Sequence, residues 1–293
     1  MEAVADQLAM ELTRTLGGSV VPNQRHVSEN RHFAGAHPQL GRLFIKVYGS
    51  RERFTREGDA LEILARHHAW VLAPVREGDL STSGHFWRAF PEVAMHPFTF
   101  DLEGCRTAAQ LLADVHGTDL TSTQLPTKPH GWELVPERLA AISRWPSVHE
   151  KAARLAQDAA LLLDDLSRGR GRRSRTRLLT EDFGVRNIHV REDDGTALLI
   201  DFEHAERGDP HWDLGKVWDQ ELVEPARRNA FVGEYRRRTG LRDWPDVRAL
   251  WATRFAAALA ILPYAARVGD AAFFDHGVEK LHRLDAELPG LLL

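Results

Sequence analysis

The stretch Asp182-Phe-Gly-Val-Arg-Asn187 places a carboxylate and a side-chain amide five residues apart. A second carboxylate follows at the end of the run Thr-Ala-Leu-Leu-Ile-Asp201. Between them, Asp194-Gly195 separates two β-forming runs, which predicts a hairpin that brings Asn187 and Asp201 to one end of a strand pair. Two acids and an amide in this order suit magnesium-dependent phosphoryl transfer, in which one carboxylate accepts the proton of the attacking hydroxyl and the other oxygen donors hold metal.

Composition limits the alternatives. The 293 residues are 43% hydrophobic and 27% charged, which is typical of a soluble globular protein long enough for two lobes. The net charge of −4 does not provide the basic field of a nucleic-acid-binding protein. The N-terminal MEAVADQLAMELTRTL predicts an amphipathic helix rather than a signal peptide, and we expect no apolar run of membrane-spanning length. Cys105 is the only cysteine, so an internal disulfide and a multi-cysteine zinc site are excluded. We therefore expect a cytoplasmic protein that binds neither nucleic acid nor membrane.

The front of the chain is rich in β-forming runs. A helix is expected over residues 3–16, ended by Gly17-Gly18, and a second helix over residues 51–68. The polar segment 76–84 is interpreted as a loop. Strands are expected at residues 19–27, 31–34, 42–48, 71–75 and 85–90. This pattern predicts a small, mostly antiparallel sheet with one inserted helix.

Helical periodicity dominates the rest of the chain, apart from the hairpin. Helices are expected at residues 102–116, 135–142, 148–166, 211–220, 225–238, 247–267 and 271–288. The change of pattern predicts two domains, a β-rich N-lobe over residues 1–92 and a helical C-lobe over residues 93–293.

Lysine is rare in a chain that uses arginine for most of its cations. Lys46 is the only lysine in the first 127 residues, and it stands within the apolar strand Arg42–Tyr48. We interpret it as a functional residue; the alternative is an edge-strand lysine whose charged end reaches solvent.

At this point the sequence resembles the aminoglycoside phosphotransferase family, the small-molecule branch of the protein-kinase-like fold. The family signature is H-G-D-x-x-x-x-N, a hairpin, I-D-F/W-E/D, and then G-D-P-x-x-D-L. The corresponding blocks here are Thr180–Asn187, Ile200-Asp201-Phe202-Glu203 and Gly208–Leu214; in addition, Phe44–Tyr48 resembles the family's lysine strand and Leu111–His116 its helix after the hinge. The resemblance implies an α+β bilobal fold, with a nucleotide-binding sheet N-lobe and a larger C-lobe that carries the catalytic loop, the metal site and the acceptor-binding helices.

The resemblance also implies roles around the phosphates. Asp182 would accept the proton of the acceptor hydroxyl and aim its oxygen at the γ-phosphate. Asn187 and Asp201 would hold Mg²⁺, and Glu203 would assist a second ion. Asp209 and Asp213 are interpreted as structural, the first in a turn and the second at a helix start.

For the nucleotide, the resemblance implies that Lys46 pairs with the α- and β-phosphates while Glu57 holds its ammonium. Backbone N–H groups of the turn from Ser28 to Asn30 would cap a phosphate. The connector backbone at Pro91–Val93 would bond the adenine. The expected cofactors are ATP and Mg²⁺, with GTP left possible because the connector does not discriminate the base.

Two features keep alternatives open. The family histidine and glycine before the catalytic aspartate are Thr180 and Glu181 here, so a catalytically impaired nucleotide-binding pseudokinase is the first rival to an active enzyme. The segment Arg168–Arg177 holds six arginines and is interpreted as a solvated loop, with a nucleic-acid tail or attraction of an anionic substrate as alternatives.

The acceptor is expected to be a small molecule with a hydroxyl group, foremost an antibiotic of the aminoglycoside type or another self-resistance substrate, bound between the catalytic loop and the C-terminal helices. Acidic residues that would suit a polyamine-bearing antibiotic stand at Glu203, Glu206, Asp209, Asp219, Glu221 and Glu224. The segment Phe86–Phe90 also resembles sugar-phosphorylating members, so a sugar or amino-sugar kinase is the alternative to antibiotic resistance. A protein substrate is disfavoured because the chain has no A-P-E segment or long activation loop.

Overall fold

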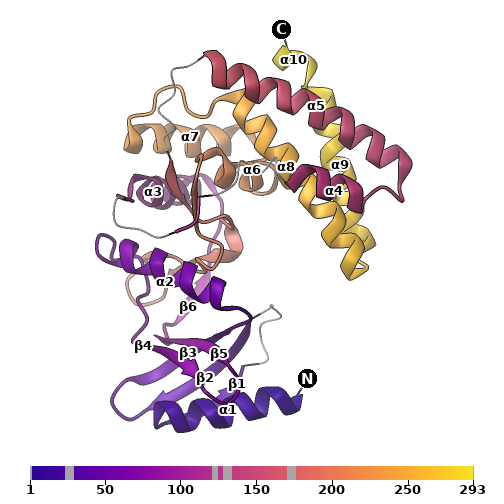
Figure 1. Cartoon of the computed structure of the whole chain (residues 1–293). Coiled ribbons are helices and arrows are strands. Elements are labelled where there is room, and N and C mark those ends of the chain that lie inside the picture. Colours follow the sequence, from indigo (N-terminus) through magenta and orange to yellow (C-terminus); the bar gives the residue numbers. More distant parts are fainter. Residues whose placement is uncertain (1, 24–29, 121–124, 128–133, 170–175, 293) are drawn as a thin grey trace. The chain divides into compact units, whose positions relative to one another are not determined.

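The computed structural model describes residues 2–23, 30–120, 125–127, 134–169 and 176–292. Ser28 and most of the Arg168–Arg177 segment lie outside these residues. The chain forms two compact units (Figure 1). Unit 1 comprises Met1–Phe98, Thr121–Leu125 and Arg186–Ala205, and unit 2 comprises Thr99–Leu120, Pro126–Val185 and Glu206–Leu293.

Unit 1 contains a five-stranded antiparallel sheet in the order β1-β2-β3-β5-β4. Its strands are β1 (Ser19–Pro22), β2 (Arg31–His37), β3 (Gly41–Tyr48), β4 (Arg76–Leu80) and β5 (His85–Pro91). Helix α1 (Glu2–Leu16) turns Leu8, Leu12 and Leu16 into the core that also contains Phe33 and Trp87. Helix α2 (Arg51–Ala65) follows β3, capped by Ser50, whose hydroxyl accepts the Arg53 N–H. The expected sheet with one inserted helix is confirmed.

One strand was predicted wrongly. Residues 71–75 form no strand, and β4 occupies Arg76–Leu80, inside the segment interpreted as a polar loop. Because β4 is an edge strand that pairs only with β5 in this sheet, its polar side chains remain exposed and interrupt no core. Proline at position 74 further disfavours strand pairing in the apolar run before it.

The predicted hairpin is present and belongs to unit 1. Strand β8 (Ile188–Arg191) pairs with β9 (Ala197–Leu199), and β6 (Met95–Pro97) pairs with the other edge of β8. Strand β6 lies within Met1–Phe98, so its pairing with β8 explains why residues 186–205 belong to unit 1. The sequence had placed these residues in a helical C-lobe over residues 93–293.

Unit 2 is mostly helical, as expected. Its helices are α3 (Leu102–Gly117), α4 (Val135–Ala141), α5 (Pro146–Gly169), α6 (His211–Gln220), α7 (Pro225–Thr239), α8 (Val247–Val268), α9 (Ala271–Glu287) and α10 (Pro289–Leu292). A core contributed by α4, α5, α8 and α9 includes Trp251, Phe255 and Leu281. Two short strands not predicted from sequence, β7 (Arg177–Leu179) and β10 (Glu206–Gly208), pair with each other; β7 precedes the predicted catalytic loop in the sequence and β10 follows it. Cys105 is fully buried in α3, and burial raises the pKa of its thiol to about 11, which fits a packing role.

Helix α8 corrects the expectation about apolar runs. By length and composition it is the one described helix that could cross a membrane. Most of its apolar window is nevertheless buried within the structure, around Trp251, Phe255 and Leu259. We therefore interpret α8 as the central core helix of unit 2.

Candidate active site

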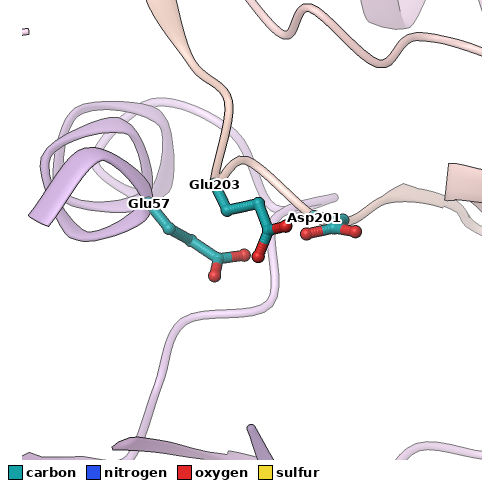
Figure 2. Close-up of side chains that lie close together, drawn as sticks. All are labelled: Glu57, Asp201 and Glu203. Carbon is teal, nitrogen blue, oxygen red and sulfur yellow. The ribbon is translucent and has the colours of Figure 1, made fainter. Parts of the chain in front are cut away.

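The site residues of unit 1 gather around one buried lysine. Lys46, on β3, is 5% exposed, and its Nζ lies 2.9 Å from Glu57 Oε2, 2.6 Å from Asp201 Oδ1 and 3.0 Å from Glu203 Oε2. Figure 2 shows the three carboxylates close together, Glu57 projecting from its helix and Asp201 and Glu203 from the segment after β9. One ammonium thus joins strand β3 and helix α2 to the segment after β9, although Asp201 lies 155 positions from Lys46 in the sequence.

Local structure explains how each group reaches this point. In β3, Lys46 is followed by buried Val47 and Tyr48, so the strand end lies in the core. Glu57 is 3% exposed on the inner face of α2, and its Oε1 accepts the backbone N–H of Phe202, 3.2 Å away. Glu57 therefore positions both the lysine and the segment that follows Asp201.

Lys46 and Asp201 differ in how strongly their surroundings favour the charged form. Burial alone would lower the pKa of Lys46, but the surrounding carboxylates raise the pKa well above its usual range. Burial raises the pKa of Asp201, and Lys46 only partly opposes it. The lysine therefore stays charged, while Asp201 is a carboxylate that gains from a nearby cation. Such a carboxylate suits a magnesium ligand.

Glu203 has a different environment. Its carboxylate accepts hydrogen bonds from the Asn30 side-chain amide and from Arg53, the latter at 3.2 Å, in addition to Lys46. Burial would raise its pKa, but hydrogen bonds from His204 and Lys46 and the charge of Lys46 hold the pKa well below its usual range. Protein cations and an amide surround Glu203, but its carboxylate also lies within 4.8 Å of those of Glu57 and Asp201, a grouping that could hold a metal ion. The expectation that Glu203 assists a second ion therefore stays a prediction.

The structure gives Asn30 a side-chain role that sequence did not predict. Its amide nitrogen donates to Glu203, and its side-chain oxygen accepts the Gly49 N–H at 3.2 Å. This side chain ties the start of β2 to the end of β3 and to the segment after β9. The predicted backbone role of the Ser28–Asn30 turn stays a prediction, because residues 24–29 lie outside the described residues.

Asn187 and Asp201 flank the hairpin at the same end, as expected. The carbonyl of Asn187 accepts the Ile200 N–H at 2.9 Å, one step beyond the Ile188–Leu199 pair. Asp201 adopts φ +67°, a left-handed conformation that costs a non-glycine residue free energy and is often found at functional sites. The turn it makes directs Phe202 toward Glu57 and leads into Glu203.

The predicted nucleotide connector lies at the end of β5. Pro91 pairs with Leu43 in the sheet, and the Glu92 N–H donates to the Arg42 carbonyl at 2.9 Å. Because Pro91 has no N–H and the Glu92 N–H is used, Val93 is the residue of Pro91–Val93 whose N–H suits an adenine contact.

In unit 2, the loop predicted to be catalytic is held by a fully buried carboxylate, Asp213 of α6. Asp213 Oδ2 accepts the Thr180 N–H at 2.9 Å, and its Oδ1 accepts the Thr180 hydroxyl at 3.0 Å and the Glu181 N–H at 2.7 Å. His116 Nε2 lies 3.1 Å from Asp213 Oδ2, and the other ring nitrogen lies 2.7 Å from the Tyr235 hydroxyl. Asp213 is structural, as expected, but it acts by binding the loop rather than by capping its own helix.

Asp182, the predicted catalytic residue, stands directly after this anchored pair. Lys216 of α6 donates to Asp182 Oδ1. Three residues later, the Val185 N–H donates to Glu221 Oε1 at 3.3 Å. Helix α6 and the residue that ends it thus bind the loop at both of its ends. Neither Lys216 nor Glu221 was predicted to do so, because their spacing from Asp182 carries no sequence signal.

The structure also shows how the acidic residues expected to bind the acceptor are engaged. Asp219 lies 2.8 Å from Arg254 Nη2, Asp209 lies 2.5 Å from His211 Nδ1, and Glu224 lies 3.3 Å from Arg227. Asp219 and Glu224 thus each have an arginine partner, which reduces the negative charge that they offer to a polycation.

The predicted site residues therefore fall into two groups. Lys46, Glu57, Asn30, Asp201 and Asn187 lie in unit 1, where the first four are joined directly or through Glu203. Asp182 lies in unit 2.

Comparisons with known proteins identify the family of this chain and its fold. A family model described as "Phosphotransferase enzyme family" matches residues 25–250. The comparison with curated protein sequences finds no match.

Among solved structures, aminoglycoside 2'-phosphotransferase-IIIa in its GDP complex is 14% identical with a TM-score of 0.70, over 97% of this chain and 99% of that chain. A thermostable mutant of aminoglycoside phosphotransferase APH(4)-Ia, in a ternary complex with AMP-PNP and hygromycin B, is 13% identical with a TM-score of 0.70, over 95% and 97%. Choline kinase LicA from Streptococcus pneumoniae is 14% identical with a TM-score of 0.66, over 96% and 99%. At these identities the likeness shows the fold, which confirms the kinase-like α+β architecture expected from the motifs.

Proposed function

The chain belongs to the phosphotransferase enzyme family, and on this premise we propose that it is an ATP- and Mg²⁺-dependent O-phosphotransferase acting on a hydroxyl of a small molecule. The observation that carries the proposal is the buried contact of Lys46 with Glu57 and Asp201, within the segment that the family model covers. A buried lysine held by a glutamate and facing a carboxylate is an arrangement that kinases use for a metal–triphosphate, and this supports the proposal.

The residues present suit a magnesium ion. Magnesium prefers oxygen donors, usually one or two carboxylates together with phosphate oxygens and waters. Asp201 supplies a carboxylate whose pKa is raised by burial, and Asn187 supplies an amide oxygen at the same end of the hairpin. When bound, the ion would neutralise charge on the phosphates. Lys46 would exchange its contact with Asp201 for phosphate oxygens, while Glu57 keeps the ammonium in place.

Asp182 would take the proton from the acceptor hydroxyl as that oxygen attacks the γ-phosphorus. In a loose transition state the carboxylate contributes mainly through orientation rather than base strength. Its place in a loop bound by Asp213 at one end and Glu221 at the other supports this role, because both contacts limit the freedom of the loop backbone.

The acceptor class has two candidates, a hydroxylated antibiotic and a sugar. Solved structures with this fold include one bound to hygromycin B and a choline kinase, so the fold by itself does not choose. The pairing of Asp219 and Glu224 with arginines favours an acceptor with few positive charges over a highly cationic aminoglycoside. The proposal therefore includes sugars and antibiotics with fewer positive charges, such as macrolides, beside aminoglycosides.

The test is transfer of labelled γ-phosphate from ATP or GTP to a panel of hydroxylated antibiotics and sugars. Asp182→Ala should lower turnover by orders of magnitude and leave nucleotide affinity nearly unchanged, whereas Asp201→Ala should abolish the magnesium-dependent part of nucleotide binding. Nucleotide binding without transfer to any acceptor or to water would favour the pseudokinase alternative. Retained activity in Asp182→Ala would remove that residue from its role.

A further inference from the structure

Helix α6 contacts three consecutive residues of the catalytic loop through two of its side chains. Asp213 binds the backbone of Thr180 and Glu181, and Lys216, one turn later on the same helix, binds the side chain of Asp182. Residues three apart on a helix lie on the same face, so the two contacts act as one surface. Asp213 fixes the loop backbone, and Lys216 binds the side chain of Asp182.

The exposure of this ion pair argues for a role other than stability. The side chains of Lys216 and Asp182 are 32% and 26% exposed. A partly exposed pair adds little to the free energy of unfolding, because solvent screens the charges and the long lysine side chain loses entropy. Lysine is also uncommon in this chain, which has five. Among the described residues, arginine supplies most of the exposed ion pairs.

We propose that Lys216 is the positioning residue for Asp182, and this inference rests on the proposed phosphotransferase function. The Nζ of Lys216 holds Oδ1 and so fixes the rotation of the carboxylate. It also balances the negative charge of Asp182, which would otherwise repel the anionic γ-phosphate.

The step that this arrangement serves is a balanced transfer. A bond forms between the acceptor oxygen and the γ-phosphorus, and the bond between the γ-phosphorus and the β–γ bridging oxygen breaks. The hydroxyl proton passes to the Asp182 carboxylate, and ADP leaves with the bridging electron pair. Lys216 donates no proton and forms no covalent bond in this sequence; its contribution is orientation and charge balance.

The experiment measures ATP hydrolysis with water as acceptor, so that the identity of the natural acceptor is not needed. Lys216→Met should lower kcat about 10- to 100-fold, as expected when a reacting group loses its orientation, with the Kd for ATP unchanged. Lys216→Arg should recover most of the rate, because a guanidinium can make the same ion pair. Lys151→Met is the matched control, since Lys151 pairs with Asp285 elsewhere in unit 2.

A double-mutant cycle separates positioning from general damage to the fold. In an Asp182→Asn background, adding Lys216→Met should leave the residual rate unchanged, because the carboxylate on which the lysine acts is gone. An additive further loss, or a wild-type kcat in Lys216→Met, would overturn the role of Lys216 while leaving the proposed function standing. A wild-type chain that binds no nucleotide would overturn the proposed function instead.

A second measurement does not need turnover. Pulse acylation with acetic anhydride, read by mass spectrometry, should modify Lys216 at least several-fold more slowly in the wild type than in Asp182→Asn, while Lys151 reacts equally in both. Equal reactivity of Lys216 in the two proteins would show that the ion pair does not form in solution and would overturn the inference.

Discussion

The hydroxyl of Thr180 donates a hydrogen bond to Oδ1 of Asp213, and both side chains are buried. Thr180 stands where family members carry a histidine, and this difference raised the alternative of an impaired enzyme. In this chain Thr180 helps to hold the loop in place, because its side-chain hydroxyl and its backbone N–H both donate to Asp213. A small hydroxyl side chain therefore replaces the histidine with a different contact.

Replacing Thr180 with valine tests this contact. Valine keeps the shape but removes the donor, so a buried carboxylate oxygen loses one of its partners, and the free energy of unfolding should fall by about 1–3 kcal/mol. Turnover should fall with it, since the loop that carries Asp182 is less firmly held. Chemical denaturation and ATP hydrolysis give the two readouts. Thr180→Ser, which keeps the hydroxyl, should stay close to the wild type in both; equal effects of the two substitutions would contradict the role of the hydrogen bond.

Glu181 offers a stabilising substitution. Its backbone has φ +62°, where family members have glycine, and a left-handed conformation costs an L-residue about 1–2 kcal/mol. Glycine removes that strain but loses about 0.5–1 kcal/mol through the greater freedom of the unfolded chain. Glu181→Gly should therefore raise the free energy of unfolding by about 0.5–1 kcal/mol. The control is Glu137→Gly in helix α4, where glycine should destabilise by about 1 kcal/mol. A loss of stability in Glu181→Gly would show that the glutamate side chain makes a larger contribution than its backbone costs.

The parts of the site predicted from sequence are those encoded locally. The hairpin between Asn187 and Asp201 follows from a turn signal between two β-forming runs, and Lys46 was identified because a lone lysine interrupts an apolar strand. Strand β4 was missed because an edge strand need not carry an apolar pattern. The sequence placed the hairpin in the helical lobe, whereas the structure groups it with unit 1. The reason is the pairing between β6 and β8, which joins segments far apart in the chain.

The remaining contacts depend on the tertiary structure. Asn30 and Glu203 meet across 173 positions of sequence, and Lys216 reaches Asp182 from another element. No spacing or periodicity encodes such contacts, so neither the side-chain role of Asn30 nor the ion pair of Lys216 was predictable. The Gly-Asp-Pro motif did indicate that Asp213 is structural, but its hydrogen bonds to Thr180 and Glu181 required the fold.

Lys46→Met should be strongly destabilising. The substitution leaves Glu57, Asp201 and Glu203 close together without their shared cation, and removing one partner from a buried ion pair costs about 3–5 kcal/mol. The sign of the pH dependence follows from Asp201, whose pKa is already raised by burial and should rise further without the lysine. A carboxyl with a raised folded-state pKa favours the protonated form in the native protein, so stability should recover as the pH falls from 7 toward 5. Urea denaturation across this range checks the prediction; a loss that is independent of pH would mean that packing, not charge, causes it.

The same substitution at a second buried lysine should have the opposite effect. Lys280 of α9 is 2% exposed and forms no ion pair within 4.0 Å among the described residues, and burial lowers its pKa despite the nearby charge of Asp219. Because methionine has a similar length and no charge to desolvate, Lys280→Met should raise the free energy of unfolding by about 1–2 kcal/mol at pH 7.

A lysine with a lowered folded-state pKa binds fewer protons in the native state than in the unfolded state. Wild-type stability should therefore gain a contribution as the pH rises toward the unfolded-state pKa of about 10.5, and Lys280→Met should lack that gain. Denaturation of both proteins at pH 7 and pH 9.5 separates the outcomes: a destabilised Lys280→Met at pH 7 would show that the ammonium is stabilised by its surroundings, and an equal pH slope in the two proteins would show that its ionisation is not linked to folding.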